Sequence, residues 1–238
     1  MQAAPSTGSW PFVGRRRHVD DIWALATDSA CGGVLLTGEA GVGKTRLADE
    51  VLAELRAEGW STLRAVATPA GRTTPFGAVA HAIPPDAVEP GVPLDPMRIF
   101  LALRGDEVAT SGRRTVVMID DIQFLDDATF TLVTQLLSAE LVFVVCTART
   151  GTPMPPSADS LVRAFNLRRA DITDLAEEDV LGTVEHVLGC KVDPGTAHAL
   201  WTVTKGNALY VRELLLGAIE AGAVVRPSSG LARLSGDA

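Results

Sequence analysis

Short apolar runs of strand length alternate with segments of helical periodicity over most of the chain. This alternation favours a parallel sheet covered by helices. We expect strands at residues 32–37, 62–67, 115–119, 141–147 and 165–167. The pattern therefore predicts an α/β fold of three layers, in which helices flank a parallel sheet.

Helical periodicity is clearest directly after the first expected strand. The apolar positions of one helical face there are Leu47, Val51 and Leu55. This helix is expected to begin near Thr45, and Gly59 fits a helix stop. A second helix is expected at residues 128–138. Residues 68–96 are rich in Pro and Gly, so we expect loops there, with one short helix at 76–83.

The last part of the chain is helical in pattern. The expected helices are 177–188, 194–204 and 208–221. They predict a small helical lid, followed by a short hairpin within residues 223–238. The composition shifts at residues 150–157, which marks a boundary or an exposed loop. We predict a nucleotide-binding core at 1–168 and a lid at 169–238, and the polar, uncapped end suggests a segment of a longer protein.

The segment between the first strand and the first helix carries the pattern GxxxxGK[ST], in the strand-to-helix context that this motif requires. Its residues are Gly38, Glu39, Ala40, Gly41, Val42, Gly43, Lys44 and Thr45, and Arg46 follows in the helix. Glycines let the backbone turn its N–H groups toward phosphate oxygens, and the helix amino terminus adds a positive dipole end. Lys44 is expected to reach the β- and γ-phosphates, and the Thr45 hydroxyl to ligate Mg²⁺. The sequence therefore predicts a nucleotide-binding phosphate loop.

Two acidic residues follow the apolar run at 115–119. We expect Asp120 to act on the metal side and Asp121 to polarise the attacking water. Their spacing from the phosphate loop leaves room for one more strand and helix. Either Asp126 or Asp127 caps the next helix. Together with the phosphate loop, the strand-end acids predict Mg-dependent hydrolysis of a nucleoside triphosphate.

Composition argues against several other functions and locations. The chain has 238 residues and a formal net charge of −8, which makes it a poor general polyanion binder, so we expect no direct DNA binding by this segment. No apolar run approaches the roughly 18 residues of a membrane span, and the amino terminus has no secretory pattern. We expect a cytoplasmic protein with buried thiols at its three cysteines, and no Cys/His spacing resembles a zinc site.

Five segments, in the expected order, resemble the nucleotide-binding region of STAND-class AAA+ ATPases, and most of all that of large LuxR-type transcriptional regulators of actinobacteria. The segments are 11–15, the phosphate loop, the strand with its two acids, 144–149 and 204–214. By this resemblance, the backbone of Val13, Gly14 and Arg15 lies along the adenine. Likewise, Thr147 or Arg149 faces the γ-phosphate.

The chain departs from the family pattern at three places. Arg16, Arg17 and His18 stand where the family has acids, and Gln123 stands where relatives often have His. In the fifth segment, Ala208 and Leu209 follow Gly206 and Asn207, whereas relatives have proline at the position of Ala208. That proline packs near the adenine. Without the resemblance, Gly206 and Asn207 indicate only a helix stop followed by a helix start.

The resemblance implies a function beyond what spacing indicates. Relatives hold ATP or ADP with Mg²⁺ between core and lid, and exchange or slow hydrolysis switches a larger regulator. The expected partners are the remaining domains of that regulator and, by self-association, further copies of the chain. The adenine preference rests on the resemblance alone.

Two other functions remain open from the sequence. One is a module that holds ADP without hydrolysing ATP. The alanine at position 208 supports this function, as does Asp121, whose side chain is shorter than the glutamate of many such enzymes. The other is a P-loop kinase of a small molecule, although that class has a short Arg-rich lid. No arginine finger is identified, and Arg163, Arg168 and Arg169 are the candidates to test.

Overall fold

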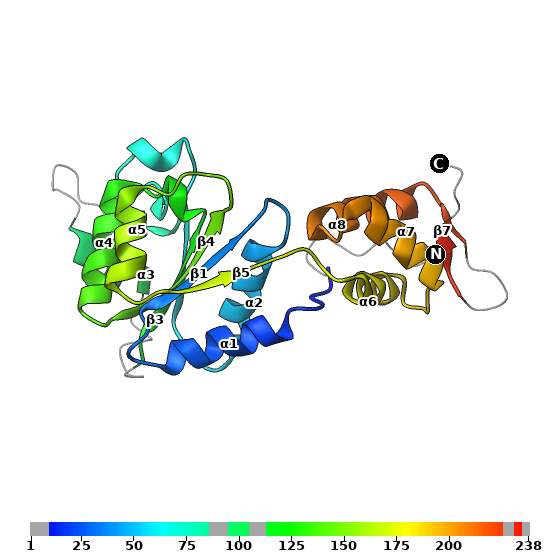
Figure 1. Ribbon diagram of the computed structural model, residues 1–238. Coiled ribbons are helices and arrows are strands. Elements are labelled where there is room, and N and C mark those ends of the chain that lie inside the picture. Colours follow the sequence, from blue (N-terminus) through cyan, green and yellow to red (C-terminus); the bar gives the residue numbers. More distant parts are fainter. Residues whose placement is uncertain (1–9, 86–94, 105–112, 226–230, 235–238) are drawn as a thin grey trace. The chain divides into compact units, whose positions relative to one another are not determined.

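The computed structural model describes residues 10–85, 95–104, 113–225 and 231–234 (Figure 1). The chain divides into two compact units. The core unit comprises Arg17–Glu39 and Lys44–Ile172. The helical unit comprises residues 10–16, Ala40–Gly43 and the described residues from Thr173 onward. The tip of the phosphate loop therefore belongs to the helical unit.

A single parallel sheet forms the centre of the core unit. Its described strands are β1 (Gly33–Gly38), β2 (Thr62–Val66), β3 (Thr115–Asp120), β4 (Val142–Arg149) and β5 (Arg168–Asp171). They lie in the order β2-β3-β4-β1-β5, and every neighbouring pair is parallel. This confirms the predicted α/β fold with a parallel sheet. The carboxyl ends of β1 and β3 flank that of β4, so residues that follow these strands lie at one edge.

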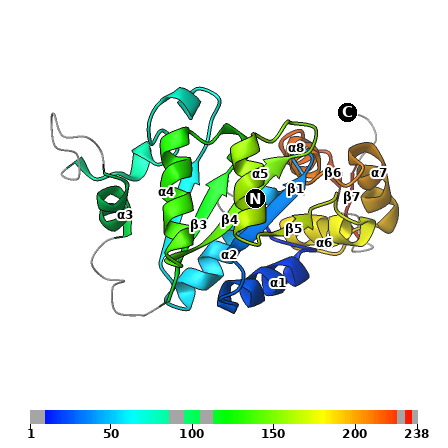
Figure 2. The same cartoon turned by 60° about the vertical axis from the view of Figure 1, so that its left-hand side comes forward.

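Helices cover both faces of this sheet. The described helices of the core unit are α1 (Arg16–Thr27), α2 (Lys44–Ala57), α3 (Pro96–Arg104), α4 (Asp127–Ser138) and α5 (Pro156–Ala164). Helices α1 and α2 lie on one face, and α3, α4 and α5 lie on the other (Figures 1 and 2). Right-handed crossovers place α2 and the later helices on opposite faces, because the chain moves across the sheet in one direction through α2 and in the opposite direction through α3, α4 and α5.

The fifth strand starts later than the pattern at 165–167 predicts. The backbone N–H groups of Phe165 and Leu167 donate to the carbonyls of Leu161 and Val162, so these residues close the end of α5. The chain becomes extended at Arg168, where its ladder with β1 begins. Because β5 pairs with β1, the core unit ends only at Ile172.

The short helix predicted at 76–83 is wrong. The structure has two short 3-10 turns instead, Gly71–Thr73 and Ala80–Ala82. The reason is a tertiary contact: the N–H groups of Phe76 and Ala78 donate to the carboxylate of Asp126, at 2.9 and 3.2 Å. Phe76 also has φ +58°, outside the right-handed helical region, and the carbonyl of Ala78 accepts from the N–H of Val66 in β2 at 2.8 Å, so it is not available for a helical bond.

Three helices of the core unit were not predicted from the pattern, namely α1, α3 and α5. Helix α1 buries Val19, Ile22 and Ala26, whose spacing of three and four residues is the signal that could have predicted it. Helix α5 begins at Pro156, inside the stretch that predicts a loop or boundary at 150–157. Proline is compatible with the first helical turn, where its missing N–H has no helical partner. A proline-rich stretch can therefore end in a helix.

The helical unit contains the three predicted helices, which confirms that expectation. They are α6 (Glu177–Leu188), α7 (Pro194–Thr204) and α8 (Ala208–Glu220). Their apolar faces share a cluster that includes Val180, Val184, Leu200, Val211 and Leu215. The predicted hairpin is present as an antiparallel pair of short strands, β6 (Val224–Val225) and β7 (Arg233–Leu234).

The described cysteines are free, as the sequence predicts, and Cys31 and Cys146 are buried whereas Cys190 is half-buried. Burial raises the pKa of the Cys146 thiol to about 12. Among the described residues, no helix is both long enough and apolar enough to cross a membrane.

Candidate nucleotide-binding site

The phosphate loop joins β1 to α2, and Lys44 is the first residue of that helix. Its ammonium group donates to the carbonyl oxygens of Gly38, at 2.9 Å, and of Glu39, at 2.7 Å. An ammonium group has three protons, so one remains for a further acceptor. Burial lowers the pKa of Lys44, and the nearby charge of Asp121 opposes this effect. Lys44 is thus a partly desolvated cation held at the base of the loop.

The next residue, Thr45, meets the end of β3. Its hydroxyl donates to Oδ1 of Asp120 at 2.9 Å. The hydroxyl of Thr147, on β4, donates to the same oxygen at 2.7 Å. Because the Thr45 hydroxyl gives its proton to Asp120, its lone pairs remain available for a cation. The two predicted metal-side residues are therefore in direct contact.

These oxygen atoms fit magnesium chemistry. Mg²⁺ prefers hard oxygen ligands, and it is usually bound by one or two protein groups together with water and substrate phosphates. The residues that the structure describes contain no group of three or more His, Cys, Asp or Glu placed to hold a metal ion. A hydroxyl and one carboxylate, the donor set of Thr45 and Asp120, suit a cation that arrives with a phosphate ligand.

The second strand-end acid, Asp121, is already hydrogen-bonded. Arg149 makes a two-pronged contact with its carboxylate, through Nη2 at 2.7 Å and Nε at 3.2 Å. The amide of Gln123 donates to it at 3.0 Å. The hydrogen bond to Asp121 raises the pKa of Arg149. The predicted water-polarising acid thus has its two oxygens engaged by donors.

The structure places Thr147 and Arg149, the two candidates for γ-phosphate contact, against the strand-end acids. Thr147 is fully buried, and its Oγ1 also accepts from the backbone N–H of Asp121 at 2.8 Å. Gln123 is buried too, and its Oε1 has no hydrogen-bond partner among the described residues. The pattern marked Gln123 only as a departure from the family, and its amide contact with Asp121 was not predicted.

The remaining loop candidates lie at the surface. Glu39 is exposed, and Arg46 forms a helix-surface ion pair with Glu50 at 3.3 Å. Such exposed pairs contribute little to stability. The structure therefore gives Arg46 a partner on its own helix, and its assignment to nucleotide binding stays a prediction.

Within the helical unit, the tip of the phosphate loop is held by other segments of that unit. The buried guanidinium of Arg15 donates to the carbonyls of Val42, at 2.8 Å, and Thr173, at 2.7 Å. Burial lowers the pKa of Arg15, and the charges of Asp179 and Asp174 oppose this effect. Arg15, which the family resemblance places beside the nucleotide, therefore also binds the loop itself.

The other predicted nucleotide-binding residues of the helical unit are Val13, Gly14, Ala208 and Leu209. Gly14 has φ +78°, and a Cβ atom built there would lie 2.4 Å from Cγ of Asp179. Val13 packs against Gly182 of α6. At the start of α8, the N–H of Leu209 donates to the carbonyl of Gly41 at 3.0 Å. A Cβ atom built on Gly43 would contact the side chain of Ala208.

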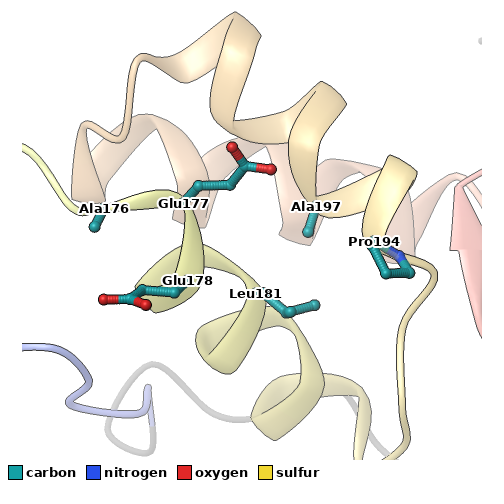
Figure 3. Close-up of a pocket in the computed structure, with 6 residues that line it drawn as sticks. All are labelled: Ala176, Glu177, Glu178, Leu181, Pro194 and Ala197. Atoms are coloured by element: carbon teal, nitrogen blue, oxygen red, sulfur yellow. The ribbon is translucent and has the colours of Figure 1, made fainter.

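A separate hollow of about 430 Å³ lies in the helical unit, between α6 and α7 (Figure 3). Its lining residues are Ala176, Glu177, Glu178, Leu181, Pro194 and Ala197. None of the residues predicted to bind nucleotide lines it. The residues predicted to bind phosphate therefore lie elsewhere, at the loop and the strand ends.

Comparison with known proteins agrees with this geometry. Residues 11–90 match the family model described as AAA ATPase domain. No protein among the curated ones matches the chain. Three examples are taken from the many solved structures with a similar fold. They are the Aeropyrum pernix ORC1 protein in complex with DNA, Thermotoga maritima RuvB and S. cerevisiae Hsp104 in complex with casein.

The similarity to these structures is one of fold. ORC1 has a TM-score of 0.64 and 18% identity over 92% of this chain and 62% of its own. RuvB has a TM-score of 0.56 and 18% identity over 88% of this chain and 63% of its own. Hsp104 has a TM-score of 0.56 and 16% identity over 89% of this chain and 37% of its own. This chain thus spans about three fifths of the first two structures and less of the third. It contains an AAA ATPase-like domain with the three-layer fold of P-loop nucleotide-binding proteins.

Proposed function

We propose that this chain binds ATP and ADP with Mg²⁺ at its phosphate loop and hydrolyses ATP slowly, as the switch module of a larger transcriptional regulator. One observation carries the proposal: the Thr45 hydroxyl and the Asp120 carboxylate are 2.9 Å apart at the sheet edge. These residues are separated by 75 positions in the sequence, so the fold brings them together. A hydroxyl and a carboxylate so placed are suited to a magnesium ion that carries phosphate.

The chemistry follows from the neighbouring side chains. Lys44 contributes a positive charge that is stronger for its burial, because a low local dielectric screens it less. When bound, Mg²⁺ supplies charge neutralisation on the phosphate oxygens. Water forms a bond to the γ-phosphorus while the bond from that phosphorus to the bridging oxygen breaks, and ADP leaves. Asp121 accepts the proton that this water loses.

We expect slow ATP hydrolysis because the carboxylate of Asp121 is already engaged in hydrogen bonds. Its carboxylate accepts hydrogen bonds from Arg149 and from Gln123. These donors engage both carboxylate oxygens, so an attacking water has to compete with them for access to Asp121. Water activation therefore needs at least one of these contacts to open.

The same contacts support a second candidate function, a module that holds ADP without turnover. In that case the pair between Asp121 and Arg149 never opens. The phosphate loop and Lys44 would bind nucleotide as before. The two functions differ in one quantity, the Mg-dependent release of phosphate from ATP.

The regulatory setting is part of the proposal. We expect the remaining domains of the larger regulator, and further copies of the chain, to be the partners. The net charge of −8 disfavours direct contact with DNA, because the phosphate backbone repels an acidic surface. Arg163 and Arg168 are exposed and Arg169 pairs with Asp159 at 3.4 Å, so a partner copy can meet the first two.

The test starts with the purified protein. It is denatured, and any nucleotide it releases is identified by chromatography. Phosphate release from added ATP is then measured with Mg²⁺ and with chelator. Bound ADP with slow, Mg-dependent release supports the switch, bound ADP without release supports the holding module, and the absence of any nucleotide affinity contradicts both.

Replacement of Asp121 by asparagine is expected to keep ATP affinity within about twofold and to lower the phosphate release rate at least about 100-fold, since general-base catalysis contributes about 10²–10⁴-fold. The amide keeps the size of the carboxylate but cannot accept a proton. Affinity is measured by calorimetry and turnover by phosphate release. Asp127→Asn, an exposed acid on α4, is the matched control. A rate equal to that of the unmodified protein would place the base elsewhere.

A further inference from the structure

Three consecutive carbonyl groups at the tip of the phosphate loop accept hydrogen bonds within the helical unit. The amide of Asn207 donates to the carbonyl of Ala40 at 3.0 Å. The backbone N–H of Leu209 donates to the carbonyl of Gly41 at 3.0 Å. The guanidinium of Arg15 donates to the carbonyl of Val42 at 2.8 Å. Two of these donors are side chains, so the contacts depend on residue type.

Fixing these carbonyls also fixes the amides that face a ligand. In a trans peptide the C=O of one residue and the N–H of the next point in opposite directions. Holding the carbonyls of residues 40–42 on one side therefore holds the N–H groups of residues 41–43 on the other. Successive N–H groups arranged in this way form a concave anion-binding site.

The turn that precedes Asn207 fixes the position of this residue. Gly206 has φ +81°, and a Cβ atom there would lie 2.1 Å from the carbonyl oxygen of Leu175, so the turn packs tightly against that residue. The N–H of Leu175 donates to the carbonyl of Gly206 at 2.8 Å. Asn207 itself is buried, and its Oδ1 lies 2.6 Å from a Cβ atom built on Gly41. The side chain thus rests directly on the loop.

We infer that Asn207 and Arg15 are positioning residues that hold the phosphate loop in its anion-binding shape before nucleotide arrives. The inference rests on the proposed nucleotide binding and adds its regulation: the start of α8 and the segment before α1 set the readiness of the loop. A loop that is already ordered loses less conformational entropy when it binds. Changes at either position should therefore alter nucleotide release without altering the fold.

The main alternative is that Asn207 only caps α8. Its Oδ1 accepts from the N–H of Tyr210 at 3.4 Å. Asn207→Ser separates the two roles, because serine caps helices about as well as asparagine but lacks the amide that reaches Ala40. Asp193→Ser is the matched control, since Asp193 caps α7 through the N–H of Thr196 and makes no contact with the loop in the structure.

The experiment measures hydrogen exchange of the peptide that covers residues 38–46 in the nucleotide-free protein, together with the dissociation rate of a fluorescent ADP analogue. Asn207→Ser is expected to speed exchange in this peptide about fivefold, as loss of one hydrogen bond typically does, and to speed ADP release by a similar factor. The melting temperature should stay close to that of the unmodified protein. Asp193→Ser should leave both rates unchanged.

Each outcome decides the inference. If the unmodified protein binds nucleotide and Asn207→Ser changes neither rate, the positioning role is overturned. If the unmodified protein binds no nucleotide, the proposed function fails, and the exchange data alone still test the contact. If Asn207→Ser does not fold, Arg15→Lys replaces it: lysine keeps the charge but cannot reach two carbonyls from one planar group, and unchanged loop exchange in that variant overturns the inference.

Discussion

Replacement of Lys44 by alanine is expected to weaken ATP and ADP binding by about 100-fold, or about 2.7 kcal/mol. The ammonium group is the buried cation of the loop, and it already donates to the carbonyls of Gly38 and Glu39. Alanine removes the charge that would face the phosphates. It also removes the donor that orients these two carbonyls. The loss of the charge and the loss of this orientation both weaken nucleotide binding.

Calorimetry with ADP, with and without Mg²⁺, measures this effect. Lys191→Ala is the matched control, since Lys191 is exposed and pairs with Glu185 on the surface of the helical unit. That control should bind nucleotide as the unmodified protein does. Undiminished affinity in Lys44→Ala would contradict the assignment of the phosphate loop.

Replacement of Asp126 by alanine is expected to lower the free energy of unfolding by about 3–5 kcal/mol, because it leaves several buried donors unsatisfied at once. The buried carboxylate accepts from the N–H groups of Phe76, Ala78 and Thr129 and from the Thr129 hydroxyl, at 2.8–3.2 Å. It therefore caps α4 and anchors the loop that precedes α3.

Urea denaturation measures the loss, and the midpoint should fall by about 1–2 M for a chain of this size. Asp127→Ala is the control. Asp127 is exposed in the first turn of α4, where an acid interacts with the helix dipole and contributes at most about 1 kcal/mol. Equal losses in the two variants would show that the buried hydrogen bonds do not carry the stability.

The sequence predicted the central elements of the fold because their signals are local. Strands such as β3 are apolar along their whole length, which distinguishes them from surface segments without knowledge of their neighbours. The phosphate loop is equally local, since glycines and a helix start lie within one short segment. Asp120 was predictable for a related reason: it follows a buried strand, and parallel strands end at a common edge.

Features that depend on distant partners were not predictable. The choice between Asp126 and Asp127 as the helix cap is set by burial and by the loop at Phe76, which lies 50 positions earlier in the chain. The pairing of Arg149 with Asp121 likewise joins two strand ends. A sequence pattern marks a charged residue but does not say which partner lies within hydrogen-bond distance.

The sequence by itself thus determined that the sheet is parallel, most of its strands, the helices α2, α4, α6, α7 and α8, and the phosphate loop with its strand-end acids. Only the tertiary structure decided which groups hold that loop, because Asn207 and Arg15 reach it from opposite ends of the chain. Hydrophobic periodicity reports the burial of each element, which is a property of nearby residues. Hydrogen bonds between buried polar groups form wherever the folded backbone brings a donor to an acceptor, and their partners are fixed only when the whole chain has folded.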